Sequence, residues 1–462
     1  MRLYAAHRRR RAAPAPARKH APGHARTLHL INPALGASAW LSGPLPAAWD
    51  QTQLPDGRWT VQGEFTPQAD VLVYQLSLRP LGAAATPGHL SAAHALGLLR
   101  ATLEAWRVRW SSTPEDLLLR RGLLYGWQMA IPVGETRCLL TDHMLLPLSW
   151  NRDAYYVARL LLDWPSGGGP EIVRRHLLWL FEQAERPDGA WGRAYLANGQ
   201  VKDRGYQLDQ QIFPLLELAD YALATDDHAT LERLRPHIAP TLQGILARGQ
   251  GWLLPTEETP ADDPIAYPYH FSSHVLLWYT LTRLAALPLA GDYPAQAAAL
   301  HAAIWRAFAL EHQGRRLFAY AIDGTGQAHF YHDANDLPLA LAPQWGFCPA
   351  TDPTWQATLA FAFSESNQGG SYAGGLGSVH TRAPWPLGDV QGLLMASAQG
   401  DPARYAAFLE RLHRAAQWDG ALPEAYAPGD FRVVSRHWFA WPNAAYGLGI
   451  ASKPAQPPKE DP

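Results

Sequence analysis

The amino-acid sequence predicts a mainly α-helical protein, a toroid of helical hairpins preceded by a small β region. Three observations support this prediction. Beyond Leu90, apolar residues recur at helical spacing in one segment after another. Strand signals between those segments are too scarce for a parallel sheet, which disfavours an α/β barrel. The connections are alternately short and long, as expected if the long loops gather at one end of stacked hairpins and form a pocket there.

The N-terminal part of the chain is expected to form a tail and then a β region. Residues 1–26 are rich in Pro and Ala and contain the basic run Arg8–Arg11, which is typical of a disordered tail. Over residues 27–88, alternating apolar residues follow the turn Pro55–Gly57, and a stretch rich in Gly, Ala and Pro then forms a linker. Residues 89–450 are assigned to the helical barrel and residues 451–462 to a disordered tail.

The helical segments follow one another along the barrel region, each with an apolar stripe facing a core. Gly, Pro and Asp punctuate the connections between them. The predicted helices are Leu90–Trp110, Glu115–Ala130, Ala154–Trp164, Glu171–Glu185, Asp209–Ala224, Ser273–Leu287, Ala295–Leu310, Thr354–Phe363, Val390–Ala398 and Pro402–Gln417.

Composition excludes several classes of function. Lys+Arg is 39 and Asp+Glu is 41, so the net charge of -2 gives no reason to expect nucleic acid or an anionic membrane as a partner. The two cysteines, Cys138 and Cys348, are expected to be free thiols, too few for a thiolate zinc site. No apolar stretch approaches the roughly 20 residues that span a bilayer, and no secretory signal is visible, so a cytoplasmic location is expected.

The connections carry acids, bases and aromatic residues, and 19 Trp and 18 Tyr residues supply rings that can stack on sugar faces. An aromatic-rich helical core explains the same composition equally well. The Arg152–Asp153 pair beside Trp150 can bind adjacent hydroxyls, and Asp209 opens another helix, although both aspartates also suit helix capping. Five such segments stand out, over 147–153, 205–211, 256–263, 333–338 with 374–381, and 422–443.

The third segment is the most acidic, with four carboxyl groups in the eight residues Thr256–Asp263. A solvated acidic loop is the usual explanation for such a run. Its flanks, however, are apolar and aromatic, and crowded acids in a partly apolar pocket are where one carboxyl group stays protonated near neutral pH. Glu424, alone in an aromatic loop, is a candidate general base, with a surface glutamate as the plainer interpretation.

Other chemistries lack their motifs. The sequence contains no HExxH, no Walker sequence, no GxGxxG after a strand and no GxSxG nucleophile elbow. His270 and His274 are the one tempting metal pair, but two histidines at helical spacing without a third ligand are more often structural. No metal and no cofactor is therefore expected.

Taken in order, the segments resemble glycoside hydrolase family 125, a group of metal-independent exo-acting α-mannosidases with an (α/α)6 barrel. The resemblance runs from about residue 120 to 448 and departs from the family pattern at Asn151, Gln210–Gln211, His274 and Pro423. Its motifs are Leu146–Asp153, Tyr206–Leu215, Pro260–Asp263 with Tyr267, Tyr269 and Ser272–His274, His332–Pro338, Gly375–Thr381, Pro423–Tyr426 and Arg436–Asn443.

The resemblance implies an inverting hydrolase that releases a terminal α-linked sugar, most simply α-1,6-linked mannose, from an oligosaccharide or glycan. It assigns the general acid to the pair Asp262–Asp263, with Asp262 preferred, and the general base to Glu424. Glu257 and Glu258 are the alternative acids. The residues expected to bind substrate are Trp150, Arg152, Asp153, Asp209, Asn335, His380, Trp438 and Trp441.

Two other functions compete with this one. An α-glucosidase or trehalase-like hydrolase of a related helical barrel would keep the two-acid mechanism but change the sugar. A non-catalytic sugar-binding barrel would keep the fold alone, which the presence of both candidate acids in their motif context disfavours. The sequence does not indicate the oligomeric state.

Overall fold

The computed structural model describes residues 113–163 and 168–452, and before them the short ranges 26–32, 37–43, 50–53, 59–62, 75–80, 93–94, 97 and 100–101. The chain divides into two compact units, Met1–Arg109 and Trp110–Pro462. This division falls about twenty residues beyond the predicted start of the barrel at residue 89. Most of the predicted helix Leu90–Trp110, and the two predicted tails except Arg26 and residues 451–452, lie outside the described residues.

The first unit contains the strands that the sequence predicts. β1 (Arg26–Asn32), β2 (Ala37–Gly43) and β5 (Gln75–Pro80) form an antiparallel sheet in the order β1-β2-β5. β3 (Asp50–Gln53) and β4 (Trp59–Gln62) pair with each other around the turn predicted at Pro55–Gly57.

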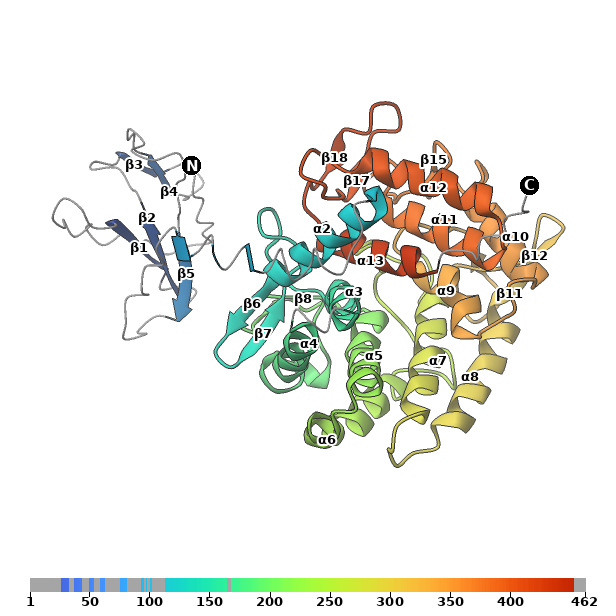
Figure 1. The fold of residues 1–462 in the computed structure, drawn as a ribbon. Coiled ribbons are helices and arrows are strands. Elements are labelled where there is room, and N and C mark those ends of the chain that lie inside the picture. The colour runs from blue at the N-terminus through green and yellow to red at the C-terminus, as the bar shows by residue number, and fades with distance from the viewer. Residues whose placement is uncertain are drawn as a thin grey trace, which may run out of the picture. The chain divides into compact units, whose positions relative to one another are not determined.

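The second unit is built of helices, with short β hairpins in some of the connections (Figure 1). Among the described residues there are twelve α-helices. They are α2 (Pro114–Met129), α3 (Asn151–Leu162), α4 (Gly169–Leu178), α5 (Leu208–Thr225), α6 (His228–Leu246), α7 (Phe271–Ala285), α8 (Tyr293–Phe308), α9 (Leu337–Trp345), α10 (Pro353–Ala362), α11 (Pro386–Ala398), α12 (Pro402–Ala415) and α13 (Ala440–Ala451).

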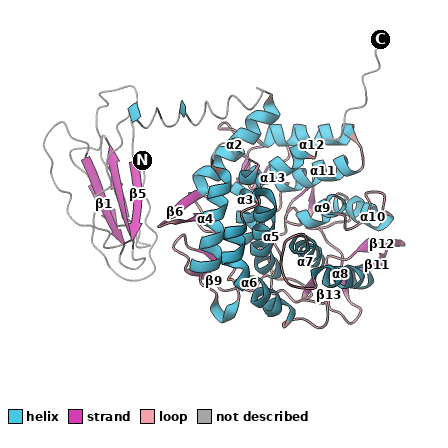
Figure 2. Ribbon diagram, turned by 60° about the horizontal axis from the view of Figure 1, so that its bottom comes forward, coloured by secondary structure: helices cyan, strands magenta, loops and turns pink. Residues whose placement is uncertain are grey.

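Six of these helices close into an inner ring, in which α3, α5, α7, α9, α11 and α13 each contact the next and α13 returns to α3. The other six lie outside this ring (Figure 2). Among them, α4 contacts α3 and α5, α6 contacts α5, α8 contacts α7, and α12 contacts α11. The predicted toroid of six helical hairpins is therefore confirmed.

The two rings differ in how much of each helix is buried. In the inner helix α11, every residue from Pro386 to Ala396 is buried, because its neighbours in the ring and an outer helix cover all its sides. In the outer helix α12, burial is confined to the stripe Tyr405, Phe408, Leu409, Leu412 and Ala415, as expected for an amphipathic helix with one face in solvent. Burial of the inner helices on all sides explains their near-continuous apolar sequence.

The sequence patterns missed three helices, α6, α9 and α13. Each contains proline. Pro236 and Pro240 lie in the interior of α6, Pro343 lies in the interior of α9, and Pro442 lies in the first turn of α13. A proline removes a backbone hydrogen bond and interrupts the local signal, so packing within the two rings must supply the stability that local propensity withholds.

The connections alternate in length as predicted. Passing from an inner to an outer helix takes few residues, as at 226–227 between α5 and α6 or 399–401 between α11 and α12. Passing from an outer to the next inner helix takes many, as in the connections over 130–150, 184–207, 247–270, 309–336, 363–385 and 416–439. These long connections all precede the N-termini of inner helices, so the acids and aromatic residues of the sequence motifs gather at that end of the ring.

Two further findings concern the described residues as a whole. None of their helices combines the length and apolar character needed to cross a membrane. Cys138 and Cys348 are both free and buried, which confirms the expectation of free thiols. Burial raises the pKa of the Cys348 thiol to about 12, so the group stays protonated near neutral pH and is a poor nucleophile.

Candidate active site

The site lies at the N-termini of the inner helices. Arg152 and Asp153 occupy the first turn of α3, and Asp209 occupies the first turn of α5. Asn335 directly precedes the N-cap residue of α9, and Trp441 lies in the first turn of α13. These helix ends carry unpaired N–H groups and partial positive charge, which suits carboxylates and the oxygens of a polar ligand.

Arg152 is the central cation of the site, and its side chain is almost fully buried. One guanidinium nitrogen lies 3.0 Å from Asp209 Oδ2, another 3.4 Å from Asp262 Oδ1, and Nε lies 3.5 Å from Asp153 Oδ1. The guanidinium also lies over the Trp441 ring, 5.0 Å from its centroid. Carboxylates from three different connections are therefore held around one cation.

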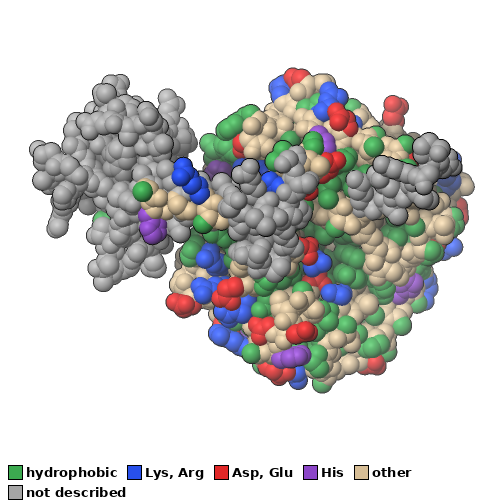
Figure 3. Space-filling model, viewed as in Figure 1, with side chains coloured by type: hydrophobic (Ala, Val, Ile, Leu, Met, Phe, Trp, Pro, Cys, Tyr) green, Lys and Arg blue, Asp and Glu red, His purple; other side chains and the backbone are tan. Residues whose placement is uncertain are grey.

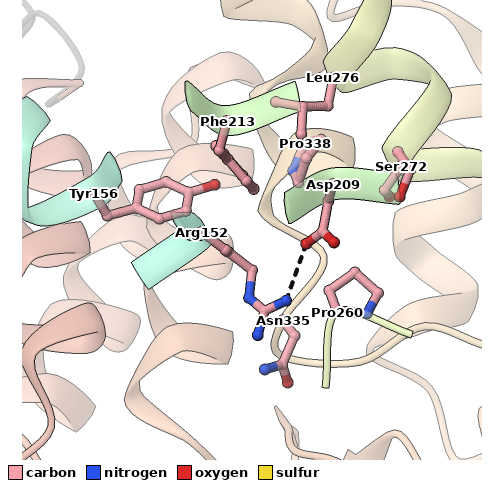
Figure 4. A pocket seen from close by; sticks show the side chains of 10 residues that line it. Arg152, Tyr156, Asp209, Phe213, Pro260, Ser272, Leu276, Asn335 and Pro338 are labelled. Atoms are coloured by element: carbon pink, nitrogen blue, oxygen red, sulfur yellow. Dashed lines mark hydrogen bonds and ion pairs between the residues drawn. The ribbon is translucent and has the colours of Figure 1, made fainter. Parts of the chain in front are cut away.

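A small cavity opens beside this arginine. In Figure 4, the Arg152–Asp209 ion pair crosses its middle, with Phe213 and Leu276 on one side and Pro260 and Asn335 on the other. The Asn335 side-chain oxygen is buried without a hydrogen-bond partner, so it is available to a ligand. The complete lining is Arg152, Tyr156, Asp209, Phe213, Pro260, Ser272, Ser273, Leu276, Asn335 and Pro338.

Asp262 is held by donors from two helix N-termini. Its carboxylate accepts hydrogen bonds from Trp150 Nε1 at 3.0 Å and Gln207 Nε2 at 2.7 Å, in addition to the Arg152 ion pair. Its φ of 63° is in the left-handed region, which only a few per cent of non-glycine residues adopt. The loop is closed by Thr259, whose backbone N–H and carbonyl bond the backbone of Asp263 and Asp262. Such a backbone is retained where the surrounding contacts fix it.

Asp263 points to a different partner, because its Oδ2 lies 2.9 Å from Nδ1 of His380. Burial alone would lower the pKa of His380, but its hydrogen bond to Asp263 and the negative charges of Asp263, Glu424 and Asp262 outweigh burial and raise that pKa. His380 is thus close enough to all three predicted catalytic acids to feel their charges. Asp263 contacts the His380 imidazole directly, whereas Asp262 and Glu424 act on it through their charges.

Glu424 is buried and directly precedes strand β17 (Ala425–Tyr426). Its partners come from β18 (Val433–Ser435) and from the residue after that strand. Its carboxylate accepts a hydrogen bond from Ser435 Oγ and pairs with the Arg436 guanidinium at 3.3 Å. The Glu424 backbone N–H also donates to the Arg436 carbonyl at 2.9 Å. The arginine and the hydroxyl hold this carboxylate in one orientation by charge-assisted hydrogen bonding.

A buried polar network supports the strand that follows Glu424. Asp389 on α11 accepts hydrogen bonds from Arg411 Nε at 2.7 Å and from the Tyr426 hydroxyl. Arg411 Nη2 in turn donates to the Tyr426 hydroxyl at 2.9 Å. Burial raises the pKa of Asp389, although Arg411 and the hydrogen bonds oppose it. The network fixes Tyr426, two residues from Glu424, to the inner ring.

A second buried cluster lies behind Asn335. Asp336 Oδ1 lies 3.2 Å from His270 Nε2, and its Oδ2 lies 3.7 Å from His332 Nδ1. Asp333 accepts the Asn335 backbone N–H at 2.8 Å, and burial, reinforced by the charge of Asp336, raises the pKa of Asp333 well above its ordinary value. The cluster fixes the backbone from which Asn335 reaches the cavity.

The predicted substrate-binding residues divide into three groups. Arg152, Asp209 and Asn335 line the cavity. Trp150 and His380 contact the two aspartates of the acidic loop. Asp153 and Trp441 lie behind Arg152, where Asp153 accepts a hydrogen bond from Thr141 and Trp441 stacks on Tyr156. Trp438 belongs to none of these groups, because its indole N–H donates to Asp419 at 2.7 Å.

The environment of Asp153 sets its charge. Burial raises its pKa to about 6, although Arg152 and the Thr141 hydroxyl act in the opposite direction. Glu258, one of the alternative acids, instead pairs with Arg193 at 2.9 Å and accepts a hydrogen bond from Gln207 at 3.0 Å. Gln207 therefore bridges Glu258 and Asp262.

Gln207 is among the site residues that sequence reasoning did not single out, together with Ser272, Ser273 and Arg436. Gln207 is the N-cap residue of α5, and both serines lie in the first turn of α7. Their positions directly before or within the first turn of an inner helix, the same position as Arg152 and Asp209, are the signal that could have found them. Arg436 carries no comparable signal in the sequence.

The histidine pair His270 and His274 has structural partners. His274 Nε2 accepts the Leu254 backbone N–H at 3.0 Å, and its Nδ1 lies 2.6 Å from the His270 carbonyl. Burial lowers the pKa of His274 to about 4. Within residues 113–163, 168–452 and the shorter described ranges, no group of three or more His, Cys, Asp or Glu side chains is arranged to hold a metal ion.

Comparison with known proteins agrees with this architecture. The solved structure of a Streptococcus pneumoniae member of a family of metal-independent α-mannosidases, in a non-productive complex with α-1,6-mannobiose, is 19% identical, with a TM-score of 0.60 over 78% of this chain and 98% of that one. A bacterial glucoamylase in complex with acarbose is 14% identical, with a TM-score of 0.61 over 93% of this chain and 73% of that one. At such identities these likenesses establish the fold.

Sequence comparison adds a match to a family. The fold is the ring of helical hairpins seen in these two structures, with acids gathered at one end of the inner ring. Residues 247–451 match the family described as metal-independent α-mannosidase (GH125), which confirms the predicted relationship and makes the chain an α-mannosidase-like hydrolase. The meiotically up-regulated gene 157 protein of Schizosaccharomyces pombe is 26% identical over 137 residues, which span 28% of this chain and about a quarter (26%) of that protein.

Proposed function

We propose that this protein is an exo-acting, inverting α-mannosidase that removes a terminal α-1,6-linked mannose from an oligosaccharide. The observation that carries the proposal is that the 262–263 pair lies at the same end of the ring as the cavity. Asp262 pairs with Arg152, which lines the cavity, and Asp263 contacts His380, whose pKa also responds to the charge of Glu424. The family matched by residues 247–451 supports mannose as the sugar.

The cavity suits a single terminal sugar. Arg152, Asp209 and Asn335 supply donors and acceptors for vicinal hydroxyls, and Tyr156, Phe213 and Leu276 supply an apolar wall. Because inner helices surround this space, a chain end can enter where a chain middle cannot. The exo mode follows from that geometry.

In the proposed reaction, an aspartic acid of the 262–263 pair donates a proton to the glycosidic oxygen while Glu424 takes a proton from water. The water attacks the anomeric carbon on the opposite face as the glycosidic bond breaks, so the configuration inverts. Inverting enzymes hold their two carboxyl groups about 6.5–9.5 Å apart to leave room for that water. The ion pair with Arg436 fixes the position of the Glu424 carboxylate.

The sequence favours Asp262 as the acid. Asp262 is held in place by hydrogen bonds from Trp150 and Gln207 and by its ion pair with Arg152. Asp263, the next residue, is the other candidate for the general acid, and its carboxylate is hydrogen-bonded to His380.

A substrate panel tests the proposed sugar. We expect wild-type protein to release mannose from α-1,6-mannobiose faster than from α-1,2- or α-1,3-mannobiose, and Glu424→Gln to lose this activity. Release of glucose from maltose, isomaltose or trehalose would transfer the specificity to the glucosidase alternative, which the likeness to glucoamylase keeps in view. No release of any sugar, or release unaffected by Glu424→Gln, would refute the site.

A second experiment separates the acid from the base. An aryl α-mannoside with a good leaving group does not need a proton donor, so the variant that lacks the acid keeps this activity while losing that on mannobiose. We expect one of Asp262→Asn and Asp263→Asn to behave in this way, and Glu424→Gln to lose both activities. Proton NMR of the fresh product should show β-mannose first; α-mannose first would contradict inversion.

A further inference from the structure

A strip of aromatic rings, exposed at its two ends and half-buried in the middle, lies beside the loop that carries Glu424 and takes no part in the site described above. It consists of Trp418, His437, Trp438 and His143. Consecutive ring centroids along it are 5.9, 4.5 and 4.9 Å apart, in that order. Trp418 is 86% exposed, so its ring is not retained for packing.

The two middle rings of the strip, His437 and Trp438, are held in place by Asp419. This carboxylate accepts hydrogen bonds from Trp438 Nε1 at 2.7 Å and from Arg121 Nη2 at 3.2 Å, and one of its oxygens lies 3.0 Å from His437 Nε2. These contacts outweigh the effect of burial and hold the pKa of Asp419 well below its usual range. Rings oriented in this way lose little conformational entropy when a ligand stacks on them.

The strip is continuous with the proposed catalytic loops on both sides. The Glu424 backbone bonds that of Arg436, and His437 and Trp438 are the next two residues. On the other side, His143 begins the turn that Asp142 closes by accepting the backbone N–H groups of Met144, Leu145 and Leu146. That turn leads within a few residues to Trp150, which contacts Asp262.

We propose that this aromatic strip binds the part of the glycan beyond the scissile bond, so that the enzyme selects long oligosaccharides over disaccharides. The inference rests on the proposed function, because it takes the leaving end of the substrate to emerge between Glu424 and Asp262. Its occupant is an uncharged chain of pyranose rings, whose apolar faces stack on aromatic rings while hydroxyls bond the imidazoles.

The charges of the strip favour this occupant over a protein partner. Its one carboxylate, Asp419, is already paired with Arg121 and His437, so the surface offers no uncompensated charge for an acidic or basic partner. A row of rings with polar edges suits a ligand that alternates apolar faces and hydroxyl groups. Exposed apolar surface without structural use marks a binding site.

The test is calorimetric binding to the Glu424→Gln variant, which should not consume its ligand. Methyl α-mannoside probes the cavity alone, and a linear α-1,6-mannotetraose probes the cavity together with the strip. Adding Trp418→Ala should weaken binding of the tetraose about 3- to 10-fold. The matched control is Trp127→Ala, which removes another exposed tryptophan, 40% exposed on α2.

The outcomes separate the strip from the cavity. If the tetraose binds no tighter than methyl α-mannoside, the inference about the strip is overturned and the proposed function stays intact. Equal binding of the tetraose by the Trp418→Ala and Trp127→Ala variants would have the same meaning. Binding of methyl α-glucoside in place of the mannoside would refute the proposed sugar, and the same variants would then test the strip with maltotetraose. A change of oligomeric state in Trp418→Ala, seen by sedimentation, would assign the strip to self-association and overturn the inference.

Discussion

Replacing Arg152 by methionine should destabilise the helical unit severely, because this cation holds three carboxylates together inside it. Its guanidinium group lies 3.0 Å from Asp209, 3.4 Å from Asp262 and 3.5 Å from Asp153. Methionine preserves much of the side-chain length and apolar stem but leaves these acids without their counter-charge. The side chains of Asp153 and Asp209 are each 5% exposed, so water cannot replace the arginine.

The size of the effect follows from that burial. Removing one partner of a buried ion pair costs about 3–5 kcal/mol, since the remaining charge stays desolvated. In a folding unit of more than 300 residues, this corresponds to a fall in melting temperature on the order of 5–10 °C. The loss should shrink toward acid pH, where the abandoned carboxylates take up protons. Adding Asp209→Asn to the Arg152→Met variant should recover part of the lost stability.

Differential scanning calorimetry at pH 5 and pH 7.5 measures this prediction. The control is Arg233→Met, which removes an arginine that pairs with Glu182 at 2.6 Å but is 56% exposed. Because solvent screens an exposed pair, the control should melt close to the wild type at both pH values. A melting temperature of Arg152→Met indistinguishable from that of Arg233→Met would refute the view that Arg152 organises the site.

Three further predictions concern ionisation. Since burial raises the pKa of Asp153 to about 6, the folded protein binds a proton at this carboxyl group more tightly than the unfolded chain does. The stabilisation from this group is complete below about pH 4 and is lost as the pH rises through 6. Asp153→Asn should flatten that part of a denaturation series, and an unchanged slope would contradict the shift. The pKa of His380, followed by NMR, should lie above the usual value of about 6.5 and fall in Asp263→Asn; a pKa that does not respond would separate the two residues. Asp389→Asn should lower both stability and turnover, whereas loss of turnover with an unchanged melting temperature would show that its network does not support the fold.

The helical segments illustrate how far local pattern reaches. α12 and α4 keep an amphipathic stripe, and the sequence predicts both at nearly their observed positions. α6 and α13 carry prolines and were missed, because their stability comes from neighbours in the two rings rather than from local hydrogen bonding.

For the acids of the site, too, the sequence reveals one part of the arrangement and the fold decides the rest. The run Thr256–Asp263 and the isolated Glu424 stand out by composition, and the family motifs assign them roles in catalysis. Which residue each acid contacts could not be found in this way. Arg436 meets Glu424 across a hairpin of one connection, whereas His380 and Gln207 come from other connections, and only closure of the ring places them on Asp263 and Asp262.

Trp438 marks the limit of motif reasoning. Its motif predicts a wall of the terminal-sugar subsite, but the structure joins it to Asp419 and the aromatic strip. A motif gives the identity and order of residues, whereas the direction of a side chain depends on the loop that faces it. Here that loop is the segment around Asp419.

The sequence by itself determined the helical class, the alternation of short and long connections, the family, and which loops bear acids. These properties are encoded by residues close together in the chain, through periodicity, turn residues and composition. The tertiary structure alone decided the charge environment of each acid, because desolvation and counter-charges come from groups distant in sequence. It also decided which aromatic rings face water, and so where a glycan could lie.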